Sequence, residues 1–136
     1  MEKHLELTDA EFANQFSLGT LTPSSFTHEA HLRLAWIHIK EHGLHLAKVN
    51  IQLQLKNFVA NLGAQDKYHA TLTVAAIEAV HHFMSHSKAS SFLAFIEEFP
   101  PLKENFKDLI NSHYSFDIFS SKEARKTYLE PDVIPF

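Results

Sequence analysis

Residues 27–43 of this 136-residue chain read THEAHLRLAWIHIKEHG, and this stretch decides the fold class. Thr27 is a residue type that caps the start of a helix, and Gly43 is one that ends it. Between them the apolar residues recur at helical spacing. Their shared face consists of Leu32, Ala35, Trp36 and Ile39. The stretch therefore predicts one amphipathic helix from His28 to His42.

The rest of the chain carries the same start and stop signals. Only 3 Gly and 5 Pro interrupt it, and each lies where a helix would begin or end. The other expected helices are 9–18, 44–62, 67–86, 91–99, 101–112 and 121–130. These signals predict an all-α fold, a single compact domain over residues 1–136 with about seven helices around a long central helix, the one at 67–86.

Residues 44–62 allow two interpretations. Val49, Ile51, Leu53 and Leu55 alternate along the chain as in a strand, yet the segment also fits helical spacing. No second strand bounded by turns is visible in the sequence, and an isolated strand cannot satisfy its backbone hydrogen bonds. We therefore expect a helix that ends at Gly63.

Composition narrows the classes of partner. A net charge of −4 with scattered basic residues argues against nucleic-acid binding, and the absence of Cys excludes disulfides and thiolate metal sites. The longest apolar stretch, 74–80, contains Glu78 and is too short to cross a bilayer. The start, MEKHLEL, lacks the apolar stretch of a secretory signal. We expect a cytoplasmic protein that acts on a small molecule. We expect neither nucleic-acid nor membrane partners, and the sequence is compatible with a homo-oligomer.

Four imidazoles mark one edge of the helix at residues 28–42. Those that share an arc of ~80° are His28, His31, His38 and His42. Imidazole is the commonest metal ligand, and the i, i+3 pair of His28 and His31 can reach one cation. We expect these two and His69 to bind a divalent transition metal (Zn, Fe, Mn or Ni) and to leave one coordination position open.

Three further side chains are expected in this site. Thr73 lies one turn after His69 and could orient a ring or a bound water, as could Tyr68 beside it. Arg33 could hold an anionic substrate. The constellation predicts a small metal-dependent enzyme, or a metal-using accessory protein, that acts on a small polar molecule.

Two other interpretations compete with this one. The same histidines could form a hydrogen-bonded polar seam between helices in a non-catalytic binding or interaction module. Alternatively, His69 and Tyr68 could supply a general acid or base without a metal, while Arg33 or Arg125 holds the substrate.

The remaining polar residues of this helix are expected to have ordinary structural places. Glu29 is expected in solvent at the helix start, where a negative charge is favourable, rather than as a general base. His38 and His42 are expected either on the surface or in the core with a carbonyl partner.

Four strings, FTHEAHLR at 26–33, KYHATLT at 67–73, SKEAR at 121–125 and EPD at 130–132, resemble a family of small bacterial helical proteins usually described as uncharacterised. The shared frame is H-x-A-H-L-R, Y-H-x-T-x-T and a tail with E-A-R and P-D. The resemblance implies no particular activity. It implies one site that draws on His28, His31, Arg33, Tyr68, His69, Thr71, Thr73, Arg125 and Asp132. Helix periodicity argues against all of these meeting, because Thr71 lies ~160° around the helix from His69.

Overall fold

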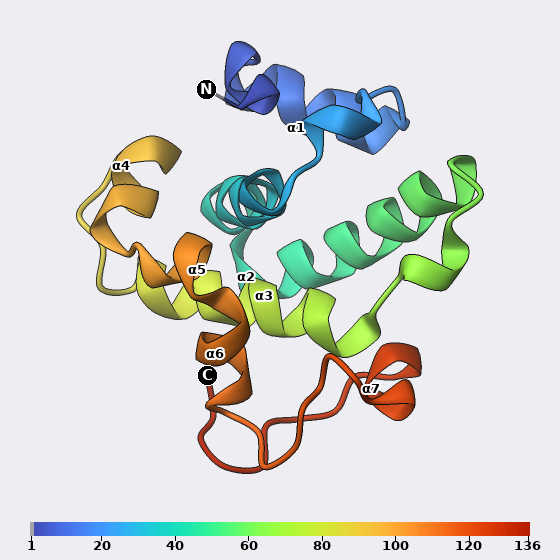
Figure 1. Cartoon of the computed structure of the whole chain (residues 1–136). Helices are drawn as coiled ribbons and strands as arrows, with labels where there is room; N and C mark the ends of the chain where they lie inside the picture. Colours follow the sequence, from blue (N-terminus) through green and yellow to red (C-terminus); the bar gives the residue numbers. More distant parts are fainter. Residues whose placement is uncertain (1) are drawn as a thin grey trace. The chain divides into compact units, whose positions relative to one another are not determined.

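The computed structural model describes residues 2–136, and over that range its regular secondary structure is helical. Seven α-helices and three short 3-10 turns follow one another along the chain (Figure 1). The predicted all-α fold with about seven helices is therefore confirmed. The chain divides into two compact units, of which the first ends at Tyr68 and the second begins at His69.

The first unit consists of two α-helices and three 3-10 turns. Its elements are η1 (Lys3–Glu6), α1 (Asp9–Leu18), η2 (Pro23–Ser25), α2 (His28–Asn61) and η3 (Gln65–Lys67). A capping box starts α1, because the Thr8 hydroxyl accepts from the Glu11 amide while the Glu11 carboxylate accepts from the Thr8 amide. Gly19 ends α1 in the left-handed conformation, with φ 74°. Both signals were local in the sequence and both are confirmed.

The long helix α2 bends at Gly43. This residue has φ 83° and ψ 171°, which are not helical values, so two helical stretches meet there at a kink. In Figure 1 the first half of α2 is seen nearly end-on while the second half runs across the view. The predicted interruption at Gly43 and the predicted helix at 44–62 are thus both found, joined in one bent element.

Aromatic rings join α1 to the second half of α2. The Phe16 ring centre lies 4.6 Å from that of Phe26 and 5.0 Å from that of Phe58, and the latter two are 5.2 Å apart. Contacts of this kind add to the burial of apolar area. They fix α1 against α2 and so determine which α1 residues face the first half of α2.

The second unit contains five α-helices. They are α3 (Ala70–Met84), α4 (Phe92–Glu98), α5 (Pro101–Glu104), α6 (Phe106–Asn111) and α7 (Lys122–Lys126). Helix α3 packs against α6 and α7. The largest fully buried apolar side chains of this unit are Phe95, Ile77, Leu102, Ile110 and Ile118.

Three predicted boundaries are wrong. The helix expected at 67–86 begins only at Ala70, because residues 65–67 form a 3-10 turn and His69, not Asp66, caps the helix. The helix expected at 101–112 is broken at Asn105, whose φ of −138° is not helical. The last helix ends at Lys126, since Thr127 is already extended.

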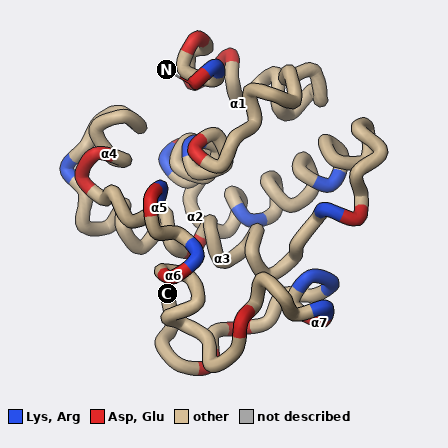
Figure 2. Tube along the Cα trace, in the orientation of Figure 1, with Lys and Arg blue, Asp and Glu red and all other residues tan. Residues whose placement is uncertain are grey.

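Charged residues are mixed along the whole described chain. Figure 2 shows Lys and Arg interspersed with Asp and Glu on the elements of both units. None of the helices within residues 2–136 combines the length and the apolar character that a membrane span requires. The cytoplasmic location stays a prediction.

Candidate functional site

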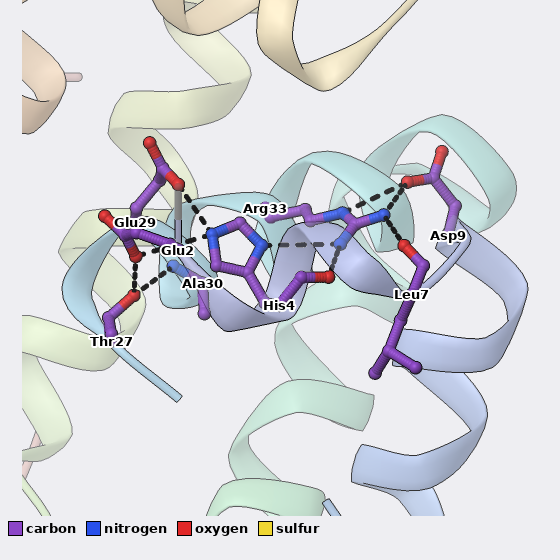
Figure 3. Close-up of polar contacts among 8 residues, drawn as sticks. All are labelled: Glu2, His4, Leu7, Asp9, Thr27, Glu29, Ala30 and Arg33. Atoms are coloured by element: carbon purple, nitrogen blue, oxygen red, sulfur yellow. Dashed lines mark hydrogen bonds and ion pairs between the residues drawn. The ribbon is translucent and has the colours of Figure 1, made fainter. Parts of the chain in front are cut away.

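Arg33 is buried at the centre of a polar network in the first unit (Figure 3). Its Nη1 donates to the His4 carbonyl at 2.6 Å and lies 3.3 Å from His4 Nδ1, and its Nη2 donates to the Leu7 carbonyl at 2.8 Å. Nη2 and Nε both donate to Asp9 Oδ1, at 2.9 and 3.2 Å. A guanidinium has five N–H donors, and all five have partners here. Arg33 therefore ties the segment that precedes α1 to α2, and the predicted role of holding an anionic substrate would require one of these bonds to break.

His4 lies between Arg33 and two carboxylates. Its Nε2 is 2.6 Å from Glu29 Oε2 and 3.5 Å from Glu2 Oε1, and the side chain is wholly buried. Because a guanidinium can only donate, we assign Nδ1 as the acceptor and Nε2 as the protonated nitrogen that donates to Glu29. The expectation that Glu29 lies in solvent is wrong, because Glu29 is buried at this contact.

The cluster of Glu2, His4 and Glu29 also has the composition of a metal site. One ligand atom from each lies within 4.8 Å of the others. However, two ligands bound at ~2.1 Å to one ion are separated by roughly 3 Å or more. The 2.6 Å between His4 and Glu29 is a hydrogen-bond distance. As described, this cluster is a hydrogen-bonded network.

The predicted ligands His28 and His31 lie in the first turn of α2. The His31 ring stacks on Phe26 with ring centres 3.9 Å apart. Desolvation by the surrounding protein, followed by the charge of His28, lowers the pKa of His31 to about 4, although His31 keeps an exposed surface. His31 is consequently neutral near pH 7, which is the form that binds metals.

His69, the third predicted ligand, caps α3. Its Nδ1 accepts from the Leu72 amide at 3.0 Å, so Nε2 carries the proton and donates to the Ile118 carbonyl at 2.9 Å. Binding a metal would break one of these two bonds. His69 begins the second unit, whereas His28 and His31 belong to the first. That the three bind one metal stays a prediction.

The other predicted site residues bond mainly to the backbone. The Thr73 hydroxyl donates to the His69 carbonyl at 2.7 Å rather than to its ring. Tyr68 is partly buried, and Lys56 Nζ lies 5.3 Å from its ring centre. Thr71 bonds to residues 127 and 129, and Asp132 accepts from the Ser115 amide at 2.8 Å.

A pocket of about 340 Å³ opens between α1 and the first half of α2. Its lining residues are Asp9, Ala10, Ala13, Ile37, His38, Glu41 and His42. Ala10 and Ala13, at i and i+3, share one face of α1. Their methyl side chains leave space where larger residues would fill it.

His38 is the buried polar group of this pocket. Its residue is 6% exposed, and neither ring nitrogen has a hydrogen-bond partner within residues 2–136. Burial, followed by the charge of His42, lowers the pKa of His38 to about 4. The expectation of a surface histidine or a histidine with a carbonyl partner is therefore wrong for His38. The i, i+4 spacing of His38 and His42 was the sequence signal for this site, but its position opposite Ala10 and Ala13 was not visible in the sequence.

No protein-family model matches the chain, and neither the curated proteins nor the solved structures contain a match. The resemblance to a bacterial helical family stays a prediction. Among the described residues, the feature of the first unit with the clearest chemical need for a partner is the ring of His38 in its pocket.

Proposed function

We propose that the protein binds a small polar molecule in the pocket between α1 and α2 and that His38 recognises it. The observation that carries this proposal is a buried imidazole whose two nitrogens lack hydrogen-bond partners within residues 2–136. Leaving a buried polar group unpaired costs ~1–3 kcal/mol. A bound molecule would supply the missing partners.

The lining of the pocket defines the ligand class. A neutral imidazole offers one donor and one acceptor, so the ligand must offer an acceptor and a donor in return. The charge of Asp9 is balanced by Arg33, so the Glu41 carboxylate on the pocket wall is the group that disfavours an anion. The volume of about 340 Å³ lies near the lower end of the usual range for ligand pockets. We infer a small neutral or cationic molecule that carries a hydroxyl, amide or amine group.

The proposal is one of binding, and it assigns no reaction step. Arg33 and His69, which were candidates for substrate and metal binding, have all their polar atoms in hydrogen bonds that join segments of their own unit. This favours a structural role for these two residues, as expected for a polar seam.

The test is a titration of the wild type and of His38→Leu with ethanolamine, glycerol, acetamide and acetate, followed by amide chemical shifts in NMR. We expect the neutral or cationic compounds to shift the signals of Ala10, Ala13 and Ile37 in the wild type and not in the variant. Acetate should bind more weakly than acetamide, because the pocket wall carries negative charge. His45→Leu, a change at an exposed histidine beyond the bend, is the matched control. Absence of shifts at the pocket with every compound would contradict the proposal.

A further inference from the structure

We propose that His38 and His42 together form a binding site for a divalent transition metal ion, whose open coordination positions face the pocket between α1 and α2. The inference rests on the proposed function, since it names the ion through which this pocket would hold a small polar ligand. It places the metal roughly two to four helical turns further along α2 than the site predicted at His28 and His31.

The spacing of the two rings suits a shared ion. Residues at i and i+4 lie on the same face of a helix, and the ring centres of His38 and His42 are 5.8 Å apart. Two imidazoles bound at ~2.1 Å to one tetrahedral ion have ring centres roughly 5 to 6 Å apart. His42 is exposed, so its ring can adjust to the ion without disturbing the core.

The nitrogens of His38 are available to a metal, whereas those of other buried histidines are not. His69 bonds through both nitrogens, and His4 bonds to Arg33 and Glu29. The lowered pKa of His38, about 4, means that protons do not compete for its ring near pH 7. Imidazole is a good ligand for Zn, Ni, Cu and Fe.

The charges around the pair favour a cation. The other titratable groups that line the pocket are Asp9 from α1 and Glu41 from α2. Asp9 is paired with Arg33, whereas Glu41 is exposed, lines the pocket and lies at i+3 from His38, on the same side of the helix. The Glu41 carboxylate is therefore the acidic group best placed to orient a water or a ligand amine on the metal.

A second pair in the chain provides a matched comparison. His82 and His86 are also spaced i, i+4, with ring centres 5.1 Å apart, but both are exposed and neither lines the pocket described here. Any weak affinity that exposed histidine pairs have for metals should appear at this pair too.

The experiment uses the full chain without a histidine tag, in a parent variant that carries His82→Ala and His86→Ala. Calorimetric titration with Ni²⁺ should give one ion per chain, and His38→Ala or His42→Ala in this parent should each weaken binding at least tenfold. His45→Ala should leave the affinity unchanged. Paramagnetic broadening by Ni²⁺ should affect the amide signals of Ala10, Ala13 and Ile37.

Ni²⁺ affinity that survives both His38→Ala and His42→Ala would overturn the metal site, as would broadening confined to the first turn of α2. His42 is exposed, so His42→Ala keeps the test decisive even if His38→Ala fails to fold. If the organic compounds bind at the pocket but Ni²⁺ does not, the metal site is wrong and the proposed function stands. If neither binds there, both are wrong.

Discussion

Three buried histidines, His4, His38 and His69, differ in what their ring nitrogens contact. His4 links Arg33 to Glu29, and His69 links the start of α3 to the Ile118 carbonyl. His38 has no such partner within residues 2–136. An unpaired buried polar group lowers stability, whereas a paired one does not. Removing the His38 ring should therefore raise the free energy of unfolding or leave it unchanged, and removing the His4 or His69 ring should lower it.

Replacing His38 by Leu should leave the ligand-free protein as stable as the wild type or more stable by ~1–3 kcal/mol. The reason is that the change removes an unsatisfied polar group while keeping the buried volume. Urea unfolding of both proteins in the presence of a chelator measures the difference. A loss of more than about 1 kcal/mol would mean that the imidazole has a partner in solution, such as an ordered water.

Replacing His69 by Ala should destabilise the protein by ~1–3 kcal/mol, because the Leu72 amide and the Ile118 carbonyl both lose a partner. His69→Asn should fall between the two, since Asn can cap a helix but is too short to reach Ile118 as the ring does. The free energies of unfolding in urea, measured without metal, test this order. Equal stability of His69→Ala and the wild type would instead support a role for His69 as a metal ligand.

The sequence predicts side-chain partners well only where they are close along the chain. The Thr8 and Glu11 capping box spans three residues, and the pattern alone indicated it. Glu29 meets His4 from 25 residues away, and that contact depends on how the turn before α1 packs on α2. No spacing rule describes such packing. The burial of Glu29 and the absence of hydrogen-bond partners for the His38 ring within residues 2–136 were therefore not predicted.

At the level of elements, the bend in α2 depends on Gly43. Its φ of 83° and ψ of 171° lie in a region that only glycine occupies without strain. The bend separates the pocket-lining half of the helix from the half that packs on Phe16 through Phe58. Gly43 therefore allows one helix both to line the pocket and to pack against Phe16.

Gly43→Ala should cost ~1–3 kcal/mol in stability. A methyl group there would meet nothing within 4 Å, so the cost is a backbone effect and not a clash. Gly63→Ala, also in open space but at φ 66°, is the matched control and should cost ~1–2 kcal/mol. Thermal or urea unfolding gives both values. A stabilised Gly43→Ala would show that the bend can straighten into continuous helix.

Helix starts were predicted better than helix lengths. Thr8 and Thr27 act as caps where the pattern placed them, because a cap is defined by its own hydroxyl and the next turn. The start of α3 was misplaced because His69, an uncommon capping residue, replaces Asp66 in this role. The break at Asn105, where φ is −138°, leaves no mark in the apolar spacing of residues 101–112.

At the scale of the whole molecule, stability should fall in mild acid. An unfolded histidine has a pKa near 6.5, whereas that of folded His38 is lowered to about 4, so the unfolded chain takes up the proton first as the pH falls. Because of this difference in pKa, the free energy of unfolding is unaffected near pH 7 and falls between about pH 6.5 and pH 4, by up to about 3 kcal/mol. The lowered pKa of His31 acts in the same direction.

Unfolding in urea at pH 7 and at pH 5 checks the expected loss of stability in acid. The stability of the wild type should drop between the two, and that of His38→Leu should drop less by about 2 kcal/mol. An equal drop in both proteins would mean that His38 titrates normally in the folded state. His45→Leu should behave as the wild type.

The hydroxyl of Thr71 has a consequence for the order in which the chain can assemble. This wholly buried group donates to the Thr127 carbonyl and accepts from the Leu129 amide, 58 residues further on. A ribosome that adds 5–20 residues each second makes that stretch in roughly 3 to 12 s. Throughout this interval the Thr71 hydroxyl lacks both of these partners. The second unit can therefore be completed only late in translation, after residues 127–129 emerge.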